Sequence, residues 1–132
     1  MSESERRRFH RFPFNASCRL GVSGQPIDCD LLDLSINGVL LKLHVEPGLG
    51  LSFDGELSLR LTGEQDGQEI DLKGTVRAVR VHADLLACHF TGMPASSFEQ
   101  LKGLVEANLG DASLLDRELT QLDYWPGLVA EA

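Results

Sequence analysis

The sequence predicts a mainly β protein with C-terminal helices: a six-stranded antiparallel β-barrel followed by two short α-helices. Apolar and polar residues alternate along six short runs between residues 15 and 91, which is the period of a half-buried strand. The runs are joined by turn-like segments without a repeating strand–helix–strand period, which favours antiparallel pairing. We expect a sheet of this size with bends to close into a small barrel. From residue 95 onward the apolar residues recur at helical spacing.

The first strand and the hairpin after it are predicted from alternation and from one strong turn signal. Cys18, Leu20 and Val22 share one face, and alternation resumes over residues 27–32 and 39–45. Asn37-Gly38, between these two runs, is typical of a type I′ turn, which needs positive φ at both central residues. Asp33 and Ser35 stand two residues apart just before the turn, so we expect them to point to one face of the strand.

The later strands follow the same pattern. Residues 56–62 alternate, a turn is expected at 63–67, and a long run covers 70–82. In that run the apolar parity changes near residues 77–79, which indicates a bulge or bend. A tight turn at Ala83-Asp84 leads into a final strand over residues 86–90.

Two helices are expected after the barrel. Residues 96–99, with the sequence Ser-Ser-Phe-Glu, are typical of a capping box, and Gly110 is typical of a helix stop. Asp111 is expected to cap the second helix, whose apolar stripe holds Leu115, Leu119 and Leu122. We expect both helices to pack an apolar face on the barrel and to expose an acidic face, either as a solvated surface or as a partner surface.

Length and charge set the organisation and exclude some functions. The 132 residues predict one unit with a flexible N-terminal arm (1–12), a barrel (13–93) and an acidic helical segment (94–132). The net charge of −8 argues against general binding of DNA, RNA or anionic membranes. No apolar run is long enough to insert into a membrane, and the polar N-terminus does not resemble a secretory signal. We therefore expect a cytoplasmic protein.

No pattern of residues indicates an enzyme or a metalloprotein. The odd, widely spaced Cys18, Cys29 and Cys88 predict free, buried thiols rather than disulfides or a zinc site. The four histidines are scattered and form no metal-binding motif. No nucleophile elbow or phosphate-binding glycine loop is present. The sequence therefore predicts no catalytic residues, no metal and no cofactor.

The arginine distribution indicates a local anion site. Four of the nine arginines are Arg6, Arg7, Arg8 and Arg11, and Phe9 and Phe12 flank them. Arginine binds phosphate bidentately and reads the O6/N7 edge of guanine, whereas a carboxylate such as Asp33 can accept from the guanine N1–H and N2–H₂. From the residues alone, a disordered basic tail and a hairpin with solvent-facing Asp and Ser remain open.

Two motifs together identify a family. Residues 7–11 fit R-x-x-x-R, and residues 33–38 fit D-x-S-x-x-G. In this order and spacing the pair resembles the PilZ domain, the bacterial receptor for cyclic di-GMP, over residues from about 6 to 93. The acidic helical tail resembles that of stand-alone PilZ proteins.

The resemblance implies a six-stranded antiparallel barrel and a nucleotide site. Arg7 and Arg11 would hold guanine edges and phosphates, Asp33 and Ser35 would hydrogen-bond another part of the ligand, and Gly38 would allow the tight turn. Further candidates for phosphate contact or stacking, chosen for charge and reach, are Arg6, Arg8, Arg77 and Arg80. Several family members bind an intercalated dimer of the nucleotide, whose four phosphates would suit the extra arginines.

The expected function is that of a cyclic di-GMP receptor. The ligand would order the N-terminal arm against the barrel and so change a surface read by an unidentified downstream protein. The alternative is a PilZ-like interaction adaptor that acts without nucleotide.

Overall fold

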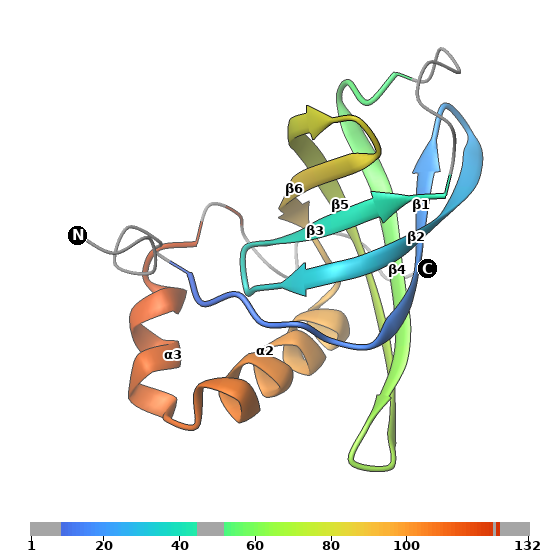
Figure 1. Cartoon of the computed structure of the whole chain (residues 1–132). Helices are drawn as coiled ribbons and strands as arrows, with labels where there is room; N and C mark the ends of the chain where they lie inside the picture. The colour runs from blue at the N-terminus through green and yellow to red at the C-terminus, as the bar shows by residue number, and fades with distance from the viewer. Residues whose placement is uncertain (1–8, 45–51, 123, 125–132) are drawn as a thin grey trace.

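The fold is a closed antiparallel barrel with two helices at one end (Figure 1). The computed structural model describes residues 9–44, 52–122 and 124. Neighbouring strands follow the order β1-β2-β3-β6-β5-β4, and every pair is antiparallel. The prediction of a six-stranded barrel with two C-terminal helices is confirmed. The elements formed by the described residues are β1 (Ala16–Val22), β2 (Gln25–Leu34), β3 (Gly38–Leu43), β4 (Glu56–Gln65), β5 (Gln68–His82), β6 (Leu85–Gly92), α2 (Ala95–Leu109) and α3 (Ala112–Leu119).

The predicted alternation fills the barrel interior. Cys18, Leu20 and Val22 of β1 are buried while Arg19 between them is exposed, and the other strands repeat this pattern. Burial of one apolar face per strand is the main favourable contribution to folding. The three cysteines are free and buried in this interior, as predicted.

The turns differ from the prediction at one important position. Positive φ at two consecutive residues occurs at Ser23-Gly24 and at Asp66-Gly67, which close the β1–β2 and β4–β5 hairpins. Neither Asn37 nor Gly38 has positive φ, so the prediction of a type I′ turn there is wrong. Gly38 is required for another reason: a Cβ at this position would overlap the carbonyl oxygen of Cys88 on β6.

The strand register shifts at three places among the described residues, once between β2 and β3 and twice between β5 and β6. The β2–β3 register shifts between Leu31 and Asp33, which leaves Leu32 as the extra residue. The β5–β6 register shifts between Ala78 and Arg80, so the bulge predicted near residues 77–79 is confirmed. Each bulge resets which side chains of its strand point outward.

The helices cover one part of the barrel through α2. Helix α2 packs on β5, and α3 packs on α2. The predicted capping box is wrong, because α2 begins at Ala95 with Pro94 as its N-cap. The hydroxyl of Ser97 instead accepts the backbone N–H of Lys73 at 3.0 Å. The predicted stop at Gly110 (φ 72°) and the cap by Asp111, which accepts from Ser113 N–H, are confirmed. Within the described ranges, no helix has the length and apolarity needed to cross a membrane.

Gly38→Ala is expected to destabilise the fold by about 1–3 kcal/mol, because the new methyl group forces β3 away from β6. Chemical denaturation measures this change. The matched control is Gly103→Ala in α2, where a Cβ meets no atom within 4 Å and alanine favours the helix by about 1 kcal/mol. Equal effects of the two substitutions would contradict the close-approach explanation.

Candidate ligand-binding site

The N-terminal segment is fixed beside the end of β2. Phe12 N–H donates to Leu34 O at 2.9 Å, and Leu34 N–H donates to Phe12 O at 2.8 Å. The Phe12 side chain is only 4% exposed and belongs to the core. The pairing brings Arg11, the last residue of the R-x-x-x-R motif, next to the D-x-S-x-x-G motif. Arg6, Arg7 and Arg8 lie outside the described residues.

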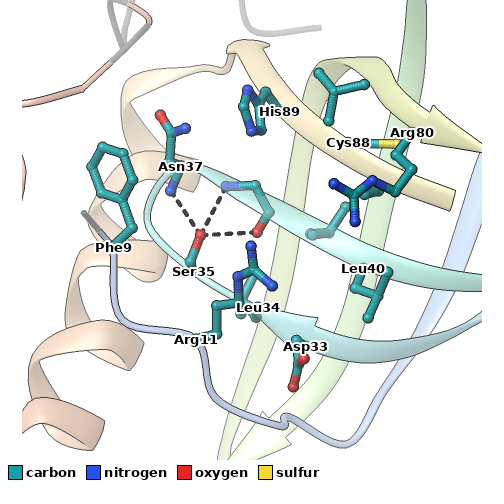
Figure 2. Close-up of a pocket in the computed structure, with 14 residues that line it drawn as sticks. Phe9, Arg11, Asp33, Leu34, Ser35, Asn37, Leu40, Arg80, Cys88 and His89 are labelled. Carbon is teal, nitrogen blue, oxygen red and sulfur yellow. Dashed lines mark hydrogen bonds between the residues drawn. The ribbon is translucent and has the colours of Figure 1, made fainter. Parts of the chain in front are cut away.

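Ser35 stabilises the turn between β2 and β3 (Figure 2). Its Oγ accepts the backbone N–H groups of Asn37 (3.2 Å) and Gly38 (3.0 Å) and donates to Gly38 O at 3.3 Å. The residue is 8% exposed. Because β2 ends at Leu34, the prediction that Ser35 is a strand residue sharing a face with Asp33 is wrong. The hydroxyl orders the turn, and a direct contact with a ligand stays a prediction.

The strand register places Asp33 and Arg80 in one row across β2, β3, β6 and β5. Asp33 pairs with Leu40, Leu40 with Ala87, and Ala87 with Arg80. Residues paired directly in an antiparallel sheet point to the same face. Asp33 and Arg80 therefore stand at the two ends of one outward-facing row, with two smaller apolar side chains between them.

This row forms the floor of a cavity of about 530 Å³. Five of the residues predicted from the motifs and the arginine pattern line it: Arg11, Asp33, Ser35, Gly38 and Arg80. Arg77 is not among the lining residues, although it pairs with the lining residue His89; its other partner is Glu56. The other lining residues are Phe9, Leu34, Asn37, Val39, Leu40, Val79, Ala87, Cys88 and His89.

Three of these lining residues can contact a ligand through a ring or an amide and were not predicted: Phe9, Asn37 and His89. His89 pairs with Gly38 and is exposed. The alternation of β6 in the sequence predicts that it points outward. Only the strand register shows that it lies beside the β2–β3 turn. Arg11, Arg80 and Asp33 surround the same space in Figure 2. The cavity thus combines two cations, one carboxylate and an imidazole. No cluster suited to a metal ion exists within residues 9–44, 52–122 and 124.

Comparison with known proteins identifies the family. The model of the PilZ domain matches residues 5–107. The chain belongs to the PilZ family. PilZ domains are typically receptors for cyclic di-GMP, and Arg11 of the first motif lines the cavity together with Asp33, Ser35 and Gly38 of the second.

Solved structures show the same fold. The Bacillus subtilis inhibitor of motility MotI/DgrA superposes with a TM-score of 0.63 at 12% identity, covering 80% of this chain and 52% of that protein. The chain thus spans about half the length of that protein. The PilZ domain of CeSA from a cellulose-synthesizing bacterium gives a TM-score of 0.52 at 19% identity, covering 77% of this chain and 99% of that domain.

Ser35→Ala is expected to lower the free energy of unfolding by about 1–3 kcal/mol, because two N–H groups of the turn lose a buried acceptor. Urea denaturation measures this. Ser52→Ala is the matched control, since the Ser52 hydroxyl also accepts a local backbone N–H, that of Asp54, at an exposed position. A Ser35→Ala protein as stable as the control variant would contradict the role given to this hydroxyl.

Proposed function

We propose that this PilZ protein is a cytoplasmic receptor for cyclic di-GMP that regulates a downstream protein. The observation that carries the proposal is the convergence of Arg11, Asp33 and Arg80 on one cavity. Arg11 and Asp33 come from the two PilZ motifs, and Arg80 directly follows the bulge on β5. Their side chains complement a ligand that has both anionic phosphates and guanine bases.

Each charged group has a role suited to its chemistry. Arg11 and Arg80 donate to phosphates or to the O6/N7 edge of guanine. Asp33 accepts from guanine N1–H and N2–H₂, which arginine cannot do. Arg7, with Arg6 and Arg8, supplies the further cations that an intercalated nucleotide dimer needs. Phosphate contacts of this kind weaken as salt is raised.

The ligand acts by ordering residues before Phe9 against the barrel. Each charge-assisted hydrogen bond contributes about 1.5–3 kcal/mol, whereas ordering the backbone costs about 1–2 kcal/mol per residue. Several contacts are needed together, and both motifs must contribute. Phe12 is already paired with Leu34, so the residues before Phe9 join a segment that is fixed to the barrel. The surface formed by the ordered arm is what the downstream protein reads.

The alternative is an adaptor that acts without nucleotide. One observation favours it: Ser35 is buried and hydrogen-bonded within its own turn, so part of the D-x-S-x-x-G motif has a structural role that needs no ligand. A partner that binds equally well with and without cyclic di-GMP would support the alternative.

Calorimetric titration with cyclic di-GMP tests the proposal. Binding is expected at nucleotide concentrations of about 50 μM or below, and Arg11→Ala or Arg80→Ala is expected to weaken it more than about tenfold through lost charge-assisted bonds. Arg77→Ala is the matched control, because this arginine neighbours the site without lining it.

Absence of binding by the parent protein would overturn the receptor proposal. If Arg77→Ala weakened binding as much as Arg80→Ala, the assignment of the cavity would be wrong, since nearby positive charge alone would then account for the affinity.

A further inference from the structure

The C-terminal segment contacts both halves of the candidate site, although none of its described residues lines the cavity. Figure 1 shows the N-terminal segment passing between α3 and the β2–β3 turn. Glu118 of α3 binds the N-terminal segment, and Tyr124, five residues beyond the end of α3, binds the turn. The inference drawn from these two contacts rests on the proposed function.

Glu118 is a buried acid that holds the N-terminal segment. Its Oε2 accepts the backbone N–H of His10 at 2.9 Å, one residue before Arg11. Glu118 is 8% exposed, and its Oε1 is buried without a hydrogen-bond partner among the described residues. Burial raises the pKa of this carboxyl, and the His10 N–H partly offsets the rise. Glu118 is therefore not part of the exposed acidic face that was expected for the helices.

His10 is held by two further groups. Its ring stacks on Phe12 with centroids 6.0 Å apart, and its Nε2 contacts the Asn108 side chain of α2. Together with the Phe12–Leu34 pairing, these contacts fix the backbone on both sides of Arg11.

Glu118, as a buried acid with one unpaired oxygen, contributes poorly to stability, so stability alone does not account for its position.

Tyr124 holds the turn through its hydroxyl. Its hydroxyl donates to Ile36 O at 2.7 Å, inside the segment closed by Ser35. The ring is buried against Phe90 and Phe98, with centroids 5.8 Å and 6.2 Å away. Burial raises the pKa of the Tyr124 hydroxyl, which keeps it protonated as a donor.

We propose that Glu118 and Tyr124 are positioning residues of the nucleotide site, which hold Arg11 and the turn at residues 35–38 in place before the ligand arrives. Fixing binding groups in advance raises affinity because less ordering remains to be done on binding. The C-terminal segment is thereby coupled energetically to nucleotide binding, which gives α3 a role beyond packing on α2.

Two substitutions at Glu118 separate positioning from stability. Glu118→Gln keeps an oxygen that can accept from His10 N–H, whereas Glu118→Leu removes the acceptor and the buried charge together. Glu118→Leu is expected to weaken cyclic di-GMP binding about three- to tenfold through the lost hydrogen bond, while its thermal midpoint stays at or above that of the parent. Glu118→Gln is expected to bind within about twofold of the parent.

Parent-like binding by Glu118→Leu would overturn the role of Glu118. Equal losses of affinity in the Gln and Leu variants would also overturn it, because the charge rather than the hydrogen bond would then matter. A drop in thermal midpoint with unchanged affinity would show a purely structural residue.

Tyr124→Phe tests the positioning proposal independently of Glu118. The ring packing is kept and only the hydroxyl is lost, so affinity is expected to fall about three- to tenfold. The matched control is Thr91→Val, which removes the part-buried hydrogen bond from Thr91 to Thr75 at 2.7 Å, between two residues that do not line the cavity. A similar stability loss with parent-like affinity is expected for the control. Equal affinities of the Tyr124→Phe and Thr91→Val proteins would overturn the role of Tyr124.

Amide NMR spectra recorded without nucleotide test the positioning proposal independently of cyclic di-GMP binding. Glu118→Leu is expected to shift the amides of His10, Arg11 and Phe12, and Tyr124→Phe those of Asn37 and Gly38, while Thr91→Val shifts none of these. If the parent binds no cyclic di-GMP but the shifts occur, the receptor proposal fails and the structural coupling stands. If the shifts are absent, the positioning proposal fails whatever the parent binds.

Discussion

The position of the candidate site depends on the hydroxyl of Ser35 and on glycine, which has no side chain, at position 38. The hydroxyl ties the backbone of residues 35–38 into a compact turn, and the glycine lets that turn lie against the Cys88 carbonyl of β6. This contact sets the register of β3 on β6. Through that register Asp33 and Arg80 fall into one row on the outer face of the barrel.

The sequence predicted the barrel because strand alternation is a local signal that one buried face imposes on each strand. It failed where two local signals competed with tertiary contacts. Asn37-Gly38 suggests positive φ, but the position is governed by the approach of Cys88. Residues 96–99 suggest a helix start, but α2 begins at Ala95 after Pro94, and the Ser97 hydroxyl inside the helix accepts the Lys73 N–H of β5.

The candidate site was predictable only in part for the same reason. Arg11 and Asp33 stand in recognisable motifs, and the parity change on β5 pointed to the region of Arg80. The sequence did not show which of Arg77 and Arg80 lies in one row with Asp33. That depends on the position of the bulge on β5 and on the cross-strand pairs. His89 depended on register, and Glu118 and Tyr124 depended on how the C-terminal segment returns to the barrel. No local sequence pattern predicts these long-range contacts.

The central claim is that the arginine motif and the turn motif form one nucleotide site. An amide NMR titration of the full chain with cyclic di-GMP tests it most directly. We expect saturable shifts in residues 33–38, at Arg80 and His89, and in residues 6–11 at the same nucleotide concentrations, with new ordering of the arginine segment. Shifts confined to the arginine segment, or none at all, would contradict the account.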